Sequence, residues 1–167
     1  MLRQALVLLA ESEGLELPAE EEYALADSLP GWTVFPDVPG ALAELRARGW
    51  RLVPLSNTDP DLLAASMVAI GVPFDGAIVA GEIGSYKPAY GHWRAFAERF
   101  DAQPGRHVHV AASLFHDIAP AQELGIPAVW INRLDETSDL PREAELTDLA
   151  ELPDTLDRIV PAELASG

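Results

Sequence analysis

The sequence contains no cysteine among its 167 residues, so it can form neither disulfides nor thiolate-based sites. Basic residues are scarce too, because 11 Lys and Arg stand against 27 Asp and Glu, for a formal net charge of -16. Such a chain repels phosphate backbones and anionic lipid, and no local basic patch offsets the excess. We therefore expect binding to neither nucleic acid nor a membrane surface.

Long hydrophobic runs are also missing. The apolar stretch from Ala5 to Ala10 leads directly into Glu11 and Glu13, which fits neither a membrane span nor a signal peptide. We therefore expect a cytoplasmic protein. The hydrophobic content of 49% is enough to bury one sizeable core, which predicts a single domain with at most a small appendage.

Glycine and proline divide the chain into alternating helical and strand patterns. Gly49, Gly71 and Gly125 each follow a helical pattern, and Pro60 suits a first helical position. We expect helices over residues 2–10, 18–29, 40–48, 60–70, 88–100, 119–124 and 154–160, and strands over 51–55, 77–80, 107–112 and 128–131. The acidic segment 135–152 is predicted to be a loop. Four strands separated by helices predict an α/β fold with a parallel, doubly wound sheet.

Polar residues follow three of these apolar runs. Ser56 and Asn57 can donate hydrogen bonds to a ligand oxygen, or they can merely cap the next helix or close a turn. Lys87 stands at a predicted helix start, where the helix dipole disfavours a cation unless an anion is near. Asp117 can cap a helix or pair with Lys87. In an open α/β sheet the carboxyl ends of the strands line the site, which predicts that these residues meet.

The histidines form no ligand set in the sequence. His116 has no second histidine at ligand spacing, so we expect it to pack in a loop. His107 and His109 share a strand face, but no cysteine or nearby carboxylate completes a zinc site. No metal and no cofactor are predicted.

The chain carries Ser56-Asn57 after a strand, then Tyr86-Lys87-Pro88, then a strand with Ser113 and Asp117, and last residues 129–133. This order of motifs resembles the haloacid dehalogenase (HAD) superfamily and, within it, the type II 2-haloacid dehalogenase-like branch. The resemblance implies a Rossmann-like core over 34–167, preceded by a partial helical cap over 1–33.

The resemblance also implies roles for the residues. Ser56 matches the serine that binds oxygens of the nucleophile or substrate, and Asn57 its neighbour at the substrate. Lys87 matches the lysine that keeps an aspartate nucleophile ionised, and Asp117 the aspartate that orients this lysine. The substrate of a complete enzyme would be a small molecule.

Two departures from the family narrow the expected chemistry. Ala112 stands where the magnesium-dependent phosphatases have a metal-binding aspartate, which disfavours a phosphatase. Ala112, Leu114 and Trp93 also replace polar residues that are usual in the dehalogenases.

The family's nucleophile motif, Asp-x-x-x-Thr after an apolar strand, does not occur in the sequence. In the family that first strand is central, so its absence should leave both neighbouring strands with unpaired edges and favour self-association. We therefore expect a haloacid dehalogenase-like hydrolase that is truncated and inactive alone. The alternatives are a non-catalytic binding or assembly protein with this fold and, less favoured, a magnesium-dependent phosphatase.

Overall fold

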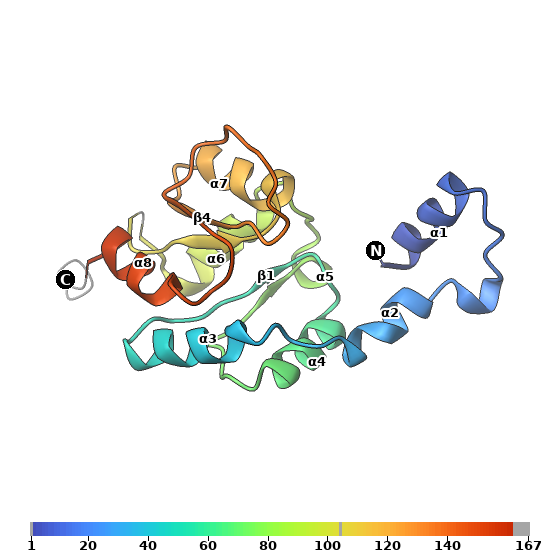
Figure 1. Ribbon diagram of the computed structural model, residues 1–167, viewed down its shortest axis with the longest axis horizontal. Coiled ribbons are helices and arrows are strands. Elements are labelled where there is room, and N and C mark those ends of the chain that lie inside the picture. The colour runs from blue at the N-terminus through green and yellow to red at the C-terminus, as the bar shows by residue number, and fades with distance from the viewer. Residues whose placement is uncertain (1, 104, 162–167) are drawn as a thin grey trace.

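A computed structural model describes residues 2–103 and 105–161 of the chain. Helices flank short parallel strands, as predicted for an α/β protein (Figure 1). The helices are α1 (Leu2–Ser12), α2 (Ala24–Ser28), α3 (Asp37–Ala47), α4 (Pro60–Ile70), α5 (Ala80–Ile83), α6 (Gly91–Phe100), α7 (Ala119–Glu123) and α8 (Leu152–Ile159). Short helical turns are η1 (Ala19–Glu21), η2 (Leu29–Gly31) and the π-turn η3 (Leu114–Ile118). The strands are β1 (Leu55–Ser56), β2 (Ile78–Val79), β3 (His109–Ala111), β4 (Ala128–Ile131) and β5 (Ala144–Leu146).

The strands form two separate parallel sheets. β1 pairs with β2, with Leu55 opposite Ile78. β4 lies between β3 and β5, with Val110 opposite Val129 and Ile131 opposite Leu146. In the described ranges no backbone pairing joins β1 to β3, so each keeps one edge without a strand partner. The parallel direction of the strands was predicted, and so were unpaired edges on two neighbouring strands. That a central strand is missing between them stays a prediction.

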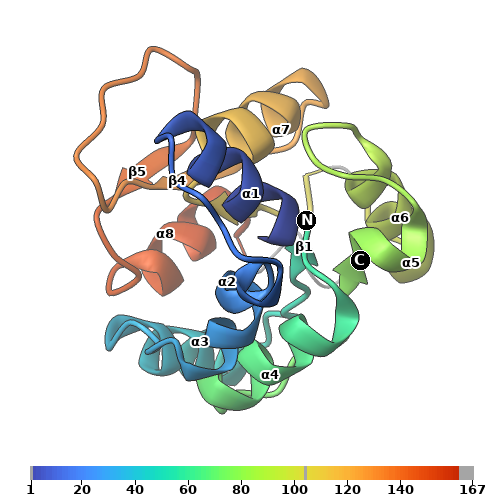
Figure 2. The ribbon, with the colours of Figure 1, turned by 90° about the vertical axis from the view of Figure 1, so that its right-hand side faces the viewer.

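β4 is the centre of the core because both of its faces are covered. Val129 and Ile131 pack with Leu45 of α3 and with Leu152 and Leu156 of α8. The alternate residues Ala128 and Trp130 face η3 and α7, where they meet Ile118 and Ala121. Figure 2, which looks along the long axis, shows the helices α3 to α8 arranged around the strands. The continuous apolar run of this strand thus reflects burial on two sides.

Several element boundaries follow from the residues that suggested them. α4 begins at Pro60 and ends before Gly71, whose φ of 71° is the left-handed conformation that glycine adopts most easily. α3 begins earlier than predicted, at Asp37, and α6 begins later, at Gly91. Lys87 therefore lies four residues before α6, in the loop that leads to this helix, where its bond to Pro88 is cis.

Three predicted elements differ from the structure. The helix expected over 18–29 is divided into η1, α2 and η2. The strand expected over 51–55 is reduced to Leu55–Ser56, because a strand without a partner on its second edge has little to extend along. The acidic segment predicted to be a loop contributes β5, whose alternation of half-buried Ala144 and Leu146 with exposed Glu145 is too short to stand out in the sequence.

Residues 2–31 form an arm that extends from the α3 side of the molecule (Figure 1). α1 packs against α2, and η2 packs against α4. Leu8 and Leu9 of α1 are each 57% exposed. A domain division at residues 33 and 34 stays a prediction. Among the described residues no helix is both long and apolar enough to cross a membrane.

Candidate active site

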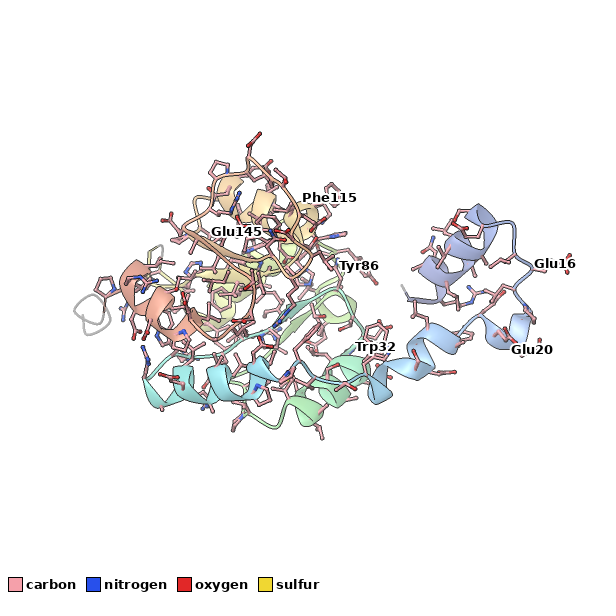
Figure 3. All side chains as sticks on the ribbon, viewed as in Figure 1. Glu16, Glu20, Trp32, Tyr86, Phe115 and Glu145 are labelled. Carbon is pink, nitrogen blue, oxygen red and sulfur yellow. The ribbon has the colours of Figure 1, made fainter. Side chains whose placement is uncertain are left out.

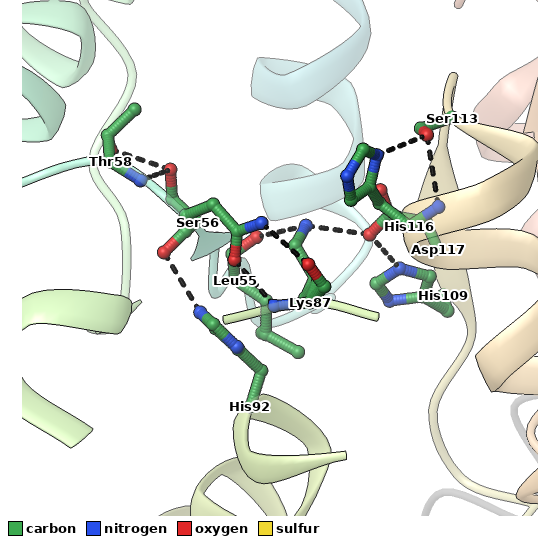
Figure 4. Close-up of polar contacts among 10 residues, drawn as sticks. Leu55, Ser56, Thr58, Lys87, His92, His109, Ser113, His116 and Asp117 are labelled. Atoms are coloured by element: carbon green, nitrogen blue, oxygen red, sulfur yellow. Dashed lines mark hydrogen bonds and ion pairs between the residues drawn. The ribbon is translucent and has the colours of Figure 1, made fainter. Parts of the chain in front are cut away.

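Lys87 is the only lysine in the sequence, and its ammonium group lies at the centre of the predicted site. Its Nζ donates to the carbonyl oxygen of Leu55 at 2.8 Å and to Oδ1 of Asp117 at 2.7 Å (Figure 4). The first partner belongs to β1 and the second follows β3. The Lys87 side chain is 11% exposed and that of Asp117 is 9% exposed. The ammonium therefore links the carboxyl ends of the two sheets.

Asn57 fixes the backbone of Lys87. Its Oδ1 accepts from the Lys87 amide nitrogen at 2.7 Å, and its Nδ2 donates to the Lys87 carbonyl oxygen at 3.0 Å. Both ends of the side-chain amide are thus engaged by the loop before α6. Asn57 holds Lys87 in place, and a contact of Asn57 with substrate stays a prediction.

Ser56 ends β1 and lies beside Asn57. Its hydroxyl lies 2.6 Å from Oγ1 of Thr58 and accepts from the Thr58 amide nitrogen at 3.2 Å. The Ser56 carbonyl oxygen lies 2.9 Å from Nε2 of the buried His92. This arrangement is the local turn that the sequence left open as an alternative to ligand binding.

Asp117 lies inside the π-turn η3 and is not the N-cap of a helix. Ser113 caps this turn, since its hydroxyl accepts from the amide nitrogen of His116. The Asp117 carboxylate is thereby free to take hydrogen bonds from other elements. Besides Lys87, Nε2 of His109 lies 2.9 Å from Asp117 Oδ1. The predicted Lys87 and Asp117 pair is present, with a histidine as third member.

The environment of Asp117 favours its ionised form. Burial by itself raises the pKa of this carboxyl, but the hydrogen bond with His109 and the charge and hydrogen bond of Lys87 outweigh burial. The pKa of Asp117 therefore lies below its usual value. Because Lys87 and Asp117 carry opposite charges at contact distance, they neutralise each other.

The structure corrects two predictions about the histidines. His116 was expected to pack in a loop, but its residue is exposed and its Nδ1 lies 3.1 Å from the Ser113 hydroxyl. His109 was expected to have no nearby carboxylate, but Asp117 lies beside it. His109 lies on a strand, and Asp117 lies eight residues later in the turn that follows this strand. The spacing in the sequence does not show that this turn brings the two side chains together.

A cavity of about 870 Å³ lies between the unpaired edges of β1 and β3. Leu55 and Ser56 line it from one side, His109 and Ala111 from the other, and Lys87 and Asp117 also line it. Trp93 of α6 lines the cavity too, and its buried Nε1 has no hydrogen-bond partner in the described ranges. We call this cavity the strand slot, because it separates two parallel strands.

Three exposed aromatic side chains lie between the core and the arm. Figure 3 shows Tyr86 and Phe115 on the side of the core that faces the arm, with Trp32 where the arm joins the core. They are 47%, 67% and 56% exposed, respectively. We call these three side chains the aromatic rim; they offer exposed apolar surface that the sequence did not single out.

The residues at the site do not resemble a hard-cation site. Ala112 is exposed and has no oxygen ligand in its side chain. In residues 2–103 and 105–161, no group of three His, Cys, Asp or Glu side chains is placed to hold a metal ion. The donors that converge are an ammonium, an imidazole and amide groups, which suit an anion better than a cation.

Comparisons with known proteins agree with this geometry. The family model for haloacid dehalogenase-like hydrolases matches residues 2–125. The (S)-2-haloacid dehalogenase 1 of Pseudomonas sp. (strain CBS-3) is 30% identical over 161 residues, which are 93% of this chain and 70% of the relative. The phosphoserine phosphatase of Thermus thermophilus is 31% identical over 104 residues, 61% of this chain and 42% of the relative.

The fold also has close counterparts among solved structures. The L-2-haloacid dehalogenase of Xanthobacter autotrophicus, solved with chloropropionic acid covalently bound, superposes with a TM-score of 0.79 at 21% identity. The match covers 92% of this chain and 73% of that one. The chain belongs to the haloacid dehalogenase-like hydrolases. Its fold is the Rossmann-like parallel fold of the dehalogenases, as the motif order predicted.

Proposed function

We propose that the chain carries the supporting half of a hydrolase site that displaces halide from carbon, and that it is inactive alone. The observation that supports this most is the Lys87 ammonium at the end of the strand slot. An ammonium has three N–H donors, and two of them meet Leu55 and Asp117. The third is left for an anion in the slot.

The anion in this proposal is an aspartate carboxylate on a strand that fills the slot. Such a strand would pair with β1 and β3 and make the sheet continuous. A carboxylate beside Lys87 would stay ionised, because an adjacent ammonium favours the charged form. The described residues supply no carboxylate at this place besides Asp117, which is already paired.

The proposed reaction has two steps. The carboxylate oxygen attacks the halogen-bearing carbon, a carbon–oxygen bond forms, and halide leaves with the bonding electron pair. Water then attacks the carboxyl carbon of this ester, which releases a hydroxy acid and a proton and restores the carboxylate. Lys87 keeps the nucleophile ionised, and Asp117 keeps Lys87 oriented. Ser56 is proposed to bind an oxygen of the nucleophile or substrate.

The substrate class in this proposal is a 2-haloacid, by similarity to the Pseudomonas relative. The aromatic rim of Tyr86, Phe115 and Trp32 would cover the apolar part of a small substrate, with residues 1–33 acting as part of a cap. A cytoplasmic location remains a prediction.

Two other functions predict different results. A magnesium-dependent phosphatase is supported by the similarity to phosphoserine phosphatase, but Ala112 supplies no metal ligand. A binding or assembly protein is supported by the unpaired edges of β1 and β3, which could take up a strand without chemistry or a second copy of the chain.

The test compares the chain alone with a completed chain. In the completed chain, a strand that carries the family's Asp-x-x-x-Thr motif is fused ahead of residue 1. Halide release from 2-chloropropionate and phosphate release from phosphoserine are measured with and without magnesium. Amide hydrogen exchange of β1 and β3 shows whether the strand docks.

We expect no turnover from the chain alone, and halide release from the completed chain that needs no magnesium. The supplied aspartate replaced by asparagine is the matched control and should be inactive. Magnesium-stimulated phosphate release would favour the phosphatase instead. Protected β1 and β3 amides without halide release would favour the binding protein, and unprotected amides would exclude the strand slot as the docking place.

A further inference from the structure

Asp117 Oδ1 receives two donors from two different elements. Lys87 Nζ approaches it at 2.7 Å from the loop before α6, and His109 Nε2 at 2.9 Å from β3 (Figure 4). Two donors on one oxygen share its negative charge. A change at His109 therefore alters how strongly Asp117 holds Lys87.

His109 is held firmly in this position. Its side chain is 11% exposed. Its ring packs against Trp93 with 5.2 Å between centroids, and its backbone pairs with Ala128 of β4. Because strand and packing fix the ring, a change in its charge acts on Asp117 directly.

The balance of charges around Lys87 indicates a role for His109. Lys87 and Asp117 together sum to zero, so the pair alone attracts a further anion weakly. A carboxylate nucleophile would leave this nearly buried cluster with one net negative charge. A protonated His109 would restore neutrality, which a site with little solvent favours.

The other titratable groups around His109 are engaged elsewhere. His92 of α6 meets the Ser56 carbonyl, and burial lowers its pKa. His107, on the segment before β3, meets the Gln103 carbonyl, and burial lowers its pKa as well. His116 is exposed beside Ser113, and Asp101 and Arg106 line the same cavity from the segment before β3.

We propose that His109 is a positioning residue that acts through Asp117. It holds the carboxylate against Lys87, and its protonated form offsets the Asp117 charge so that the Lys87 ammonium acts on the nucleophile. Only the role toward the nucleophile rests on the proposed function. The link from His109 through Asp117 to Lys87 exists in the chain alone.

The single lysine makes this link measurable without turnover. Lysine labelled with ¹³C at the ε carbon gives one side-chain signal, that of Lys87, whose shift is followed from pH 5 to 8. The variants are His109→Gln, which keeps an N–H donor but cannot gain charge, and His109→Leu, which removes the donor. His107→Gln is the matched control on the segment before the same strand.

We expect the native Lys87 signal to move in one step within this range and to do so unchanged in His107→Gln. The step should vanish in both His109 variants, while only His109→Leu should move the signal toward that of a solvated lysine. A step that persists in His109→Gln, or no step in the native chain, would overturn the proposal. If the His109→Leu variant does not fold, the result for His109→Gln alone tests the proposal. Since no substrate is present, failure here is separate from failure of halide release.

Discussion

At the scale of single residues, only a few groups hold Lys87 in its place at the site. The ammonium has two partners in the described ranges, Leu55 and Asp117, and the backbone is held by Asn57 through two hydrogen bonds. Each of these contacts joins residues about thirty positions apart. The position of Lys87 is therefore a tertiary feature, and single substitutions should disturb it measurably.

Replacement of Lys87 by methionine should abolish halide release by the completed chain and lower stability as well. The variant leaves Asp117 nearly buried with His109 as its remaining partner, which should cost about 1–3 kcal/mol. The nearly buried ion pair of Lys87 and Asp117 is the reason for expecting this loss of stability. Urea unfolding of the chain measures it, with Arg94→Met as an exposed control. Unchanged stability, or halide release that survives, would contradict these roles of Lys87.

Replacement of Asn57 by alanine should lower stability by about 1–2 kcal/mol, because both hydrogen bonds to the Lys87 backbone are lost. Asn57→Asp keeps the acceptor for the Lys87 amide but loses the donor, so its loss should be smaller. Thermal unfolding of the two variants provides the comparison. Equal midpoints for both variants and the native chain would show that Asn57 does not hold the loop.

At the scale of elements, the divided sheet is the main feature. β1 and β3 run parallel to their partners but do not pair with each other, and the strand slot lies between them. The helices hold the two sheets in place: α6 packs on β1 and β2, and α3 packs on α8. Two glycines, one in the segment before β2 and one inside α3, lead to opposite predictions.

Gly76 should not tolerate a side chain, whereas Gly40 should. Gly76 has a φ of 154°, and a Cβ there would lie 2.7 Å from the Phe100 ring, so Gly76→Ala should cost about 1–3 kcal/mol. Gly40 lies inside α3, and a Cβ there would meet no other atom within 4 Å, so Gly40→Ala should stabilise by about 0.5–1 kcal/mol. Chemical denaturation of both variants tests the pair, and a stable Gly76→Ala would contradict the tight approach of Phe100.

The sequence predicted those elements whose ends are marked by local chemistry. Pro60 and Gly71 bound α4 as expected, and the apolar run of β4 was found as a strand. The meeting of Lys87 with Asp117 followed from motif order. The contact of His109 with Asp117 and the strand character of Ala144–Leu146 did not, because both depend on which segments pack together.

At the scale of the whole molecule, acidic residues dominate, and several are held ionised by the fold. The hydrogen bond from Arg133 lowers the pKa of Asp37, and the backbone amide of Leu52 lowers that of Asp75. Asp117 and Asp157 have lowered pKa values as well. His92 and His107 are held neutral by burial, which lowers their pKa.

Stability should therefore fall in two ranges as the pH decreases. Below about pH 6.5, His92 and His107 bind protons in the unfolded chain before they do so in the folded chain, because burial lowers their pKa there. This difference lowers the stability of the folded chain. Below about pH 4 the unfolded aspartates bind protons before the folded ones do, and their contribution is lost as the pH falls through the lowered folded values. Urea unfolding from pH 8 to 3 should show both declines. A stability that stays constant from pH 8 to 5 would contradict neutral buried histidines.

The role of Lys87 beside a supplied nucleophile is tested most sharply by the intact mass of the completed chain, quenched during turnover of 2-chloropropionate. We predict a covalent adduct on the supplied aspartate, formed with loss of halide, that is absent from the Lys87→Met variant. No adduct on a completed chain whose β1 and β3 amides are protected, or an adduct that forms equally without Lys87, would contradict the proposed role of this site.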